Sequence, residues 1–237
     1  MLWSAPPVNL NLAANEIHLW RANLDLRKVQ PTQIAATLSP DEQERGARFY
    51  REQDRKRFLV GRYLLRKLLA SYLKLEAKEL RFNYNPYGKP ILANKDPIHF
   101  NLSHSQNLAI YAISLTHQIG VDLELVRALN DIKQIAQRFF SAREYAKLNS
   151  LPQQQQLECF FRFWTCKEAY LKGIGEGIGG LEGVEIELRE GELPILTKVT
   201  GWSLFQFIPD TDYIGALAVA GKSWRVRCWD LQPEINL

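Results

Sequence analysis

The apolar and polar positions divide the chain into strand-like and helix-like stretches, beginning with a strand. Residues 16–24 alternate apolar with polar side chains and predict this strand, with His18 on its polar side, at the surface or at a sheet edge. Apolar residues then recur at helical spacing over residues 41–74. Ser39, with Glu42 three positions later, forms a capping box and predicts where this helical tract begins.

The following stretches predict a hairpin and two further strands. Residues 81–92 have the pattern of a strand, an Asn-Pro-Tyr-Gly turn and a second strand, in which Gly88 takes a positive φ and holds Lys89 at the turn. The nearly continuous apolar run 108–115 predicts a central buried strand. Residues 119–125 predict another strand, whose acidic side chains would by default form a polar outer face.

The second half predicts helices followed by short strands. Residues 130–148 form a helical region with a boundary near Phe140, and residues 158–175 form an amphipathic helix that ends at glycines. The polar segment 151–156 is predicted to be a surface connection, and the glycine-rich segment 173–183 a mobile loop. Strand-like alternation then continues over residues 184–189, 195–198, 202–207, 214–220 and 224–229.

Composition changes this picture little. The 237 residues allow one large domain or two small ones, and the elements fall into two halves that meet near residues 116–120. The net charge of +4 fits an anionic small molecule or an acidic protein partner better than nucleic acid. Three cysteines without a metal-type spacing favour a reduced, cytoplasmic setting. Neither a secretory signal nor a membrane span is expected from the apolar stretches.

Two separated segments carry candidate chemistry. On the helix over residues 158–175, Trp164, Glu168 and Lys172 fall at i, i+4 and i+8 and share one face. On the strand over residues 119–125, Asp122 and Glu124 are two apart and point the same way. Three carboxylates of this kind are suited to Mg²⁺, which prefers oxygen ligands. Whether the two segments meet is left open by the spacing.

Other polar segments allow several interpretations. The tract 41–74 is rich in arginine and lysine, which is compatible with a solvated helix face, a phosphate-binding surface or a nucleic-acid helix. Ser103 and His104 precede the buried strand and are either a polar turn or a ligand-binding mouth; no Gly-x-Ser-x-Gly elbow surrounds the serine, so a serine hydrolase is disfavoured. The glycines of residues 173–183 follow a helix, so they are no dinucleotide fingerprint.

Taken together and in this order, the motifs resemble those of the 4′-phosphopantetheinyl transferases, in the longer surfactin-synthetase-type branch. The resemblance rests on Gly120-Val121-Asp122-Leu123-Glu124 followed by Phe163-Trp164-Thr165-Cys166-Lys167-Glu168-Ala169 and Lys172. Further matches are Arg48-Phe49-Tyr50, Tyr87-Gly88-Lys89-Pro90, Phe100-Asn101-Leu102-Ser103-His104-Ser105 and Arg138-Phe139-Phe140-Ser141 with Glu144. At Glu42 some relatives carry a basic residue toward the nucleotide phosphate, which makes Arg45 the better phosphate candidate here.

The resemblance implies a fold and a reaction. The fold would be α+β, a pseudo-twofold arrangement of two similar halves, each a small, mainly antiparallel sheet with packed helices. Residues 1–117 would contact the phosphates of coenzyme A, and residues 118–237 would hold the metal site and the catalytic helix. The chain would act as a holo-[acyl-carrier-protein] synthase, a Mg²⁺-dependent enzyme that moves the phosphopantetheine arm of coenzyme A onto a serine of an apo acyl or peptidyl carrier protein and releases adenosine 3′,5′-bisphosphate.

The resemblance also implies roles for named residues. Asp122, Glu124 and Glu168 would hold Mg²⁺, with Glu168 as general base and Lys172 on the transferred phosphate; the catalytic set is Glu168, Lys172 and Asp122. Coenzyme A would be bound by Arg45, Lys89, Ser103, His104 and Lys172. A monomer would suffice, without nucleic acid or membrane. The alternatives are a Mg²⁺-dependent phosphodiesterase and a non-catalytic nucleotide-binding relative.

Overall fold

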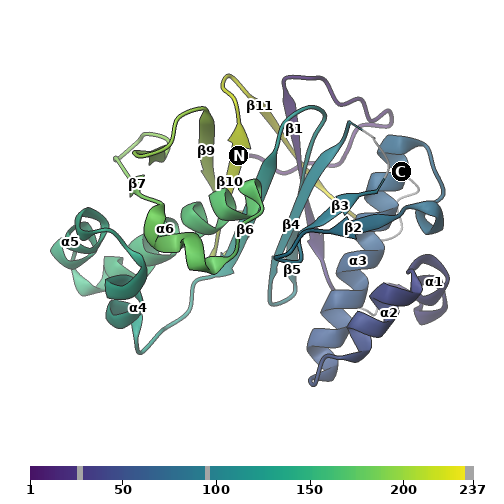
Figure 1. Cartoon of the computed structure of the whole chain (residues 1–237), viewed down its shortest axis with the longest axis horizontal. Coiled ribbons are helices and arrows are strands. Elements are labelled where there is room, and N and C mark those ends of the chain that lie inside the picture. Colours follow the sequence, from purple (N-terminus) through teal and green to yellow (C-terminus); the bar gives the residue numbers. More distant parts are fainter. Residues whose placement is uncertain (26–28, 94–96, 233–237) are drawn as a thin grey trace.

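The computed structural model describes residues 1–25, 29–93 and 97–232, and within these ranges two α+β halves lie side by side (Figure 1). The N-terminal half begins with β1 (Glu16–Asn23) and the helices α1 (Pro31–Thr37), α2 (Pro40–Ala47) and α3 (Glu52–Leu73). It continues with a short 3₁₀ turn η2 (Ala77–Glu79), the hairpin β2 (Phe82–Tyr84) and β3 (Pro90–Leu92), and the strands β4 (His99–Ser105) and β5 (Leu108–Ser114).

The C-terminal half begins at β6 (Ile119–Leu125) and contains the helices α4 (Ile132–Phe139), α5 (Ala142–Ser150) and α6 (Gln153–Ile174). A 3₁₀ segment η3 (Ile178–Gly183) and the short pair β7 (Ile186–Glu187) and β8 (Ile195–Leu196) follow. The half ends with β9 (Trp202–Phe207) and β10 (Tyr213–Ala220), after which β11 (Arg225–Asp230) closes the described chain. Figure 1 shows α1–α3 on the side of one sheet and α4–α6 on the side of the other, with α1 and α2 packed on α3, and α4 and α5 on α6.

The two main sheets have different strand orders. The first runs β11-β1-β5-β4 and the second β6-β10-β9. All these pairings are antiparallel except that of β1 with β11, which is parallel, so a strand from the end of the chain completes the sheet of the N-terminal half. The prediction of mainly antiparallel sheets is confirmed.

Each half has its own core, and a third core joins them. The long helix α3 packs on the first sheet and α6 on the second, each through its apolar face. A third cluster combines Ile17 and Ile110 of the first sheet with Val121 and Leu217 of the second. The halves are therefore held together by buried apolar surface, whose removal from water is the main favourable term in folding.

Polar side chains of β4 connect the edges of the two sheets. Asn101 Oδ1 accepts a hydrogen bond from the backbone N–H of Val121 (2.9 Å), and Ser105 Oγ accepts one from the backbone N–H of Leu125 (3.1 Å). These side chains thus satisfy backbone donors of β6 that would otherwise be buried without a partner. The seam between β4 and β6 is consequently polar, and the candidate acids of β6 lie along it.

The prediction for His18 is wrong. Its side chain is fully buried, and its Nδ1 lies 2.5 Å from the hydroxyl of Tyr72, which also accepts a hydrogen bond from Trp20 Nε1. Because β11 pairs with one edge of β1 and α3 covers this face, the side that alternation marks as polar lies in the interior. Burial lowers the pKa of His18 to about 4, so the imidazole is neutral at pH 7.

Two predictions around α6 are also wrong. Residues 153–156 are not a connection but the exposed first turn of α6, which begins directly after Pro152; glutamine is a good helix former. The segment 173–183 is not an open loop throughout, because Gly173 still belongs to α6 and η3 forms from Ile178 to Gly183. Gly175 ends the helix with a φ of 82°, as its lack of a Cβ allows.

Gly120 sets how closely β6 approaches α6, and its replacement by alanine is expected to destabilise the protein. A Cβ at this position would overlap the backbone O of Ala169 and the backbone N of Gly173. Backbone atoms cannot rotate away, so α6 must move off β6, at a cost of about 1–3 kcal/mol. Urea denaturation should show this loss, together with slower catalysis, since α6 and β6 carry the candidate acids. Gly183→Ala, where a Cβ meets nothing within 4 Å, is the control.

Candidate active site

The strand β6 and the helix α6 bring the predicted charged groups together. Asp122 is buried, 3% exposed, and its Oδ1 accepts hydrogen bonds from Lys172 Nζ (2.5 Å) and Ser103 Oγ (3.0 Å). Lys172 Nζ also lies 3.0 Å from Ser103 Oγ. The default interpretation of the acids as a polar outer face is therefore wrong for Asp122, because α6 and β4 cover it.

The other two acids lie beside this cluster. Glu124 Oε2 accepts a hydrogen bond from Ser105 Oγ (3.1 Å), and Glu168 is buried, 8% exposed, near enough to Asp122 and Lys172 for their charges to act on it. Three acids that the sequence left in two separate segments thus lie near enough for Asp122 to act on the charges of the other two, and all three act on Lys172.

Burial and mutual repulsion perturb these acids. Burial, reinforced by the charge of Asp122, raises the pKa of Glu124 to about 7, and the same two causes raise the pKa of Glu168. Burial alone would lower the pKa of Lys172, but Asp122, Glu168 and Glu124 together raise it. The cluster therefore attracts positive charge, which is the electrostatic condition for a cation site.

The residues fit a divalent cation, although the side chains are not arranged as a finished metal site. In the part of the chain that the structure describes, no three His, Cys, Asp or Glu residues are grouped closely enough to hold an ion. Asp122 Oδ2, however, is buried without a hydrogen-bond partner there, and an unpaired buried carboxylate oxygen is costly. Carboxylate oxygens are also the donors that Mg²⁺ prefers. Asp122, Glu124 and Glu168 could hold Mg²⁺ once substrate phosphates complete its shell.

A cavity of about 350 Å³ opens beside this cluster and lies between the two halves. Its lining includes all the residues that the sequence assigned to coenzyme A: Arg45, Lys89, Ser103, His104 and Lys172. Ser103 and Lys172 also contact Asp122, so the cavity is continuous with the acidic cluster. Its volume is within the usual range for small-molecule sites.

Lys89 is held by the turn as predicted, but its amine contacts the C-terminal half. Asn85 Oδ1 accepts hydrogen bonds from the backbone N–H groups of Tyr87 and Lys89 and fixes the turn around Gly88, whose φ is 82°. Lys89 Nζ donates to the carbonyl of Gly173 (2.8 Å), and burial lowers the pKa of this amine to about 8. The turn therefore joins the two halves and also lines the cavity.

The predicted coenzyme A contacts leave out several residues of the lining, although Arg57 and Arg62 belong to the basic tract 41–74, for which phosphate binding was one interpretation. Arg57, Arg62, Tyr84 and Tyr87 also border the cavity. Helical spacing could have pointed to Arg62. It lies four residues after Phe58 on α3, and both side chains face the cavity.

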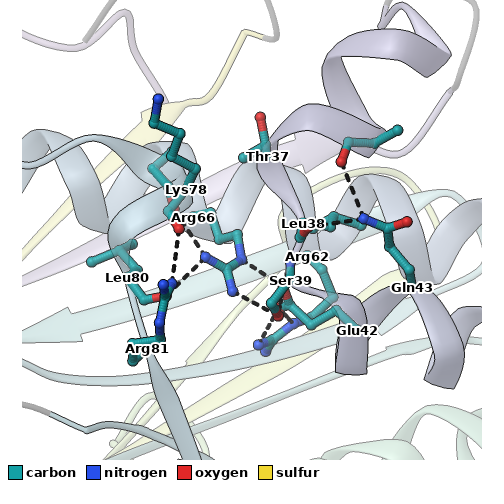
Figure 2. A network of polar contacts seen from close by, with 12 residues as sticks. Thr37, Leu38, Ser39, Glu42, Gln43, Arg62, Arg66, Lys78, Leu80 and Arg81 are labelled. Carbon is teal, nitrogen blue, oxygen red and sulfur yellow. Dashed lines mark hydrogen bonds and ion pairs between the residues drawn. The ribbon is translucent and has the colours of Figure 1, made fainter.

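Two arginines of the basic tract are buried around one carboxylate and do not form a solvated face. Glu42 is fully buried and accepts hydrogen bonds from Arg62 Nε through Oε1 and from Arg66 Nε through Oε2, each at 2.5 Å (Figure 2). Arg62 and Arg66 are 5% and 1% exposed. Ser39, the predicted capping residue of α2, donates to the same carboxylate (2.9 Å).

Comparison with known proteins identifies the class. The family model described as the 4′-phosphopantetheinyl transferase superfamily matches residues 118–218, and the model described as 4′-phosphopantetheinyl transferase, N-terminal, matches residues 27–116. The chain therefore belongs to the 4′-phosphopantetheinyl transferase superfamily.

Curated relatives make the assignment more specific. The 4′-phosphopantetheinyl transferase HetI of Nostoc sp. is 47% identical over 230 residues, which cover 96% of this chain and 97% of the relative. The 4′-phosphopantetheinyl transferase Sfp of Bacillus subtilis is 32% identical over 67% of this chain and 70% of its own. The transferase gsp of Aneurinibacillus migulanus is 39% identical over 61% and 59%. The predicted Sfp-type family, the α+β fold and the enzymatic transfer of 4′-phosphopantetheine from coenzyme A to carrier proteins are confirmed.

Proposed function

We propose that the cavity between the halves binds coenzyme A and that the adjoining acidic cluster transfers its 4′-phosphopantetheine arm to a serine of an apo acyl or peptidyl carrier protein. The observation that carries this proposal is the continuity of the two sites: Lys172 and Ser103 line the cavity and both contact Asp122. A diphosphate in the cavity would thus lie beside the groups that could act on it.

In the proposed reaction, the serine oxygen bonds to the phosphorus that carries the pantetheine arm. The bond from this phosphorus to the bridging oxygen breaks, and adenosine 3′,5′-bisphosphate leaves with the electron pair. Glu168 takes the serine proton, for which its raised pKa suits it. Lys172 and Asp122 complete the catalytic set with Glu168. Lys172 holds the phosphate oxygens while negative charge shifts during the transfer. Mg²⁺ bound by Asp122, Glu124 and Glu168 would neutralise diphosphate charge.

We assign different parts of the coenzyme A site to the two halves of the chain. Arg45, Lys89, Ser103 and His104 of residues 1–117 bind its phosphates, and residues 118–237 supply the acids and Lys172. Partial desolvation lowers the pKa of His104, an exposed residue of the lining, and the charges of Lys172 and Arg57 act in the same direction. Its imidazole N–H would donate to a phosphate oxygen. Both halves of one chain complete the cavity, which supports a monomeric enzyme.

The cysteines support a proposal about the cellular setting. Within the described ranges no helix is both long and apolar enough to cross a membrane. Cys159, Cys166 and Cys228 are buried free thiols, which supports the proposal of a reducing, cytoplasmic location. The net charge of +4 suits an acidic carrier protein.

The test is the intact mass of an apo acyl carrier protein incubated with this protein, coenzyme A and Mg²⁺. A gain of one phosphopantetheine arm is expected. Hydrolysis of coenzyme A without a gain in carrier mass would instead support the phosphodiesterase alternative. Binding of coenzyme A with neither product, across several unrelated apo carriers, would leave a non-catalytic relative.

Removal of the metal is expected to stop transfer, and loss of a metal ligand to weaken binding of the ion. EDTA in excess should abolish the mass gain, and added Mg²⁺ should restore it.

Asp122→Asn should weaken Mg²⁺ binding roughly tenfold or more, since affinity follows the number of charged ligands. Titration calorimetry in the presence of adenosine 3′,5′-bisphosphate measures this directly. Glu182→Gln, at an exposed carboxylate of the same half, is the control and should bind normally.

A further inference from the structure

The cavity has two parts with different electrostatic surroundings. The charges that act on Lys172 come from Asp122, Glu168 and Glu124, the acidic cluster where the transferred phosphate must lie. The charges that act on Tyr84, elsewhere in the lining, come from Arg62, Glu42, Asp41 and Arg45. The two sets share no residue. In the described residues, Arg45 and Arg62 contact Tyr84, and Arg62 also contacts Glu42, whereas Lys172 and Ser103 contact Asp122. The part around Tyr84 is therefore separate from the acidic cluster and suits the portion of the ligand that does not react.

The part around Tyr84 presents two guanidinium groups. The guanidinium carbons of Arg45 and Arg62 lie 5.6 and 5.9 Å from the centre of the Tyr84 ring, and both side chains line the cavity. Arg45 is exposed there, whereas Arg62 is almost fully buried. A buried arginine that borders a cavity is a fixed donor, since its planar fork loses little freedom on binding an oxyanion.

Glu42 fixes the position of Arg62. Its Oε1 accepts from Arg62 Nε, and Arg62 Nη2 lies 3.2 Å from the Tyr84 hydroxyl. In the part of the chain that the structure describes, Arg62 Nη1 makes no hydrogen bond. The one carboxylate of Glu42 faces two buried arginines, Arg62 and Arg66 (Figure 2), and Arg45 lies over the ring of Tyr84. With Asp41 counted as well, three guanidinium groups face two carboxylates, which leaves an excess of one positive charge.

We propose that Arg62, positioned by Glu42 and assisted by Arg45, is a specificity-determining ligand for the 3′-phosphate of the nucleotide. This inference rests on the proposed function, since it names what distinguishes coenzyme A from its 3′-dephospho form at the same cavity. Apart from the reacting diphosphate, the 3′-phosphate monoester is the anionic group of coenzyme A. Arginine binds such a group through paired charge-assisted hydrogen bonds. Glu42 is a positioning residue, because it acts through Arg62.

The assignment explains the carboxylate at position 42. A lone glutamate beside a phosphate would repel it, but this one is buried between two guanidinium groups and holds one of them toward the cavity. Arg62 of α3 thus adds its positive charge to that of Arg45 on α2, and the carboxylate serves to orient Arg62.

The experiment measures the affinities for adenosine 3′,5′-bisphosphate and for 5′-AMP by titration calorimetry, and the transfer rates with coenzyme A and with 3′-dephospho-coenzyme A. Arg62→Met should weaken binding of the bisphosphate on the order of tenfold, the usual effect of losing a hydrogen bond to a charged group, with little change for 5′-AMP. KM for coenzyme A should rise while kcat stays similar. Glu42→Gln should lower the affinity for the bisphosphate relative to that for 5′-AMP, as Arg62→Met does.

Arg66 offers a matched control. It shares the carboxylate of Glu42, but its Nη1 donates to the carbonyls of Ala77 and Leu80, and it does not line the cavity. Arg66→Lys should lower stability and leave the affinity ratio unchanged. An equal loss for both nucleotides in Arg62→Met, or a ratio shift as large in Arg66→Lys, would overturn the proposal. A wild-type protein that discriminates the nucleotides but transfers nothing would support this site and refute the proposed function.

Discussion

Replacement of Glu168 by glutamine is expected to reduce the rate of phosphopantetheine transfer by about 10²–10⁴-fold, the range for loss of a general base. Glutamine keeps the size and most of the polarity of the side chain, but it cannot take the serine proton and binds a cation poorly. Glu168 is buried on α6 beside Asp122 and Lys172, and burial raises its pKa. The variant should therefore fold, because it removes a charge from a repulsive cluster.

The kinetic pattern distinguishes this role from a structural one. At saturating Mg²⁺, KM for coenzyme A should change little and kcat should fall, because the predicted coenzyme A contacts lie on other residues. Intact mass of the carrier over time provides the rate. Glu158→Gln, at an exposed position on the same helix, is the control and should retain full activity. Normal kcat in Glu168→Gln would assign the proton transfer to another group or to water.

The largest expected loss of stability follows from Lys167→Met. Lys167 and Glu144 are both fully buried, and Lys167 Nζ lies 2.8 Å from Glu144 Oε2. The amine also donates to the carbonyls of Phe139, Leu181 and Val184, so it ties α4 and η3 to α6. Removal of one partner leaves a buried carboxylate without its counter-charge. The free energy of unfolding should fall by about 3–5 kcal/mol.

Urea denaturation of matched variants measures this loss. Lys56→Met breaks a surface ion pair with Glu52, in which the Lys56 side chain is 48% exposed and the Glu52 side chain 76%. This change should cost at most about 1 kcal/mol of stability. The double variant Lys167→Met with Glu144→Leu should recover part of the stability, because no unpaired charge remains. Recovery should be incomplete, since Glu144 also accepts hydrogen bonds from the backbone N–H groups of Ser141 and Ile186. A loss for Lys167→Met no larger than that for Lys56→Met would show that the buried pair is not stabilising.

The sequence predicted the parts of the candidate site that depend on short-range rules. The turn around Gly88 follows from one residue that tolerates positive φ, and the shared face of Glu168 and Lys172 follows from helical period. That β6 and α6 meet could not be derived from spacing. This contact depends on the close approach at Gly120 and on the buried faces of two elements far apart in the chain.

The errors have a common physical origin in long-range burial. Alternation marks His18 as polar because imidazole is polar, but its surroundings are set by Tyr72 and Trp229, which lie far away in the sequence. In the same way, Arg62 and Arg66 resemble solvated helix residues until Glu42 is seen between them. A local pattern shows the polarity of a side chain but not its partner. Buried ion pairs are therefore the features that are hardest to predict from it.

The pairing of β1 with β11 constrains how the protein forms during its synthesis. β1 lies between β5 and β11, and β11 consists of Arg225–Asp230. While the ribosome is still translating the C-terminal half, one edge of β1 has no partner strand, and an open edge can pair with another chain. The N-terminal sheet is completed only after Arg225–Asp230 have emerged, more than 100 residues after β5. Nascent chains truncated before β11 should therefore associate or be degraded, even though they already contain every residue proposed for catalysis.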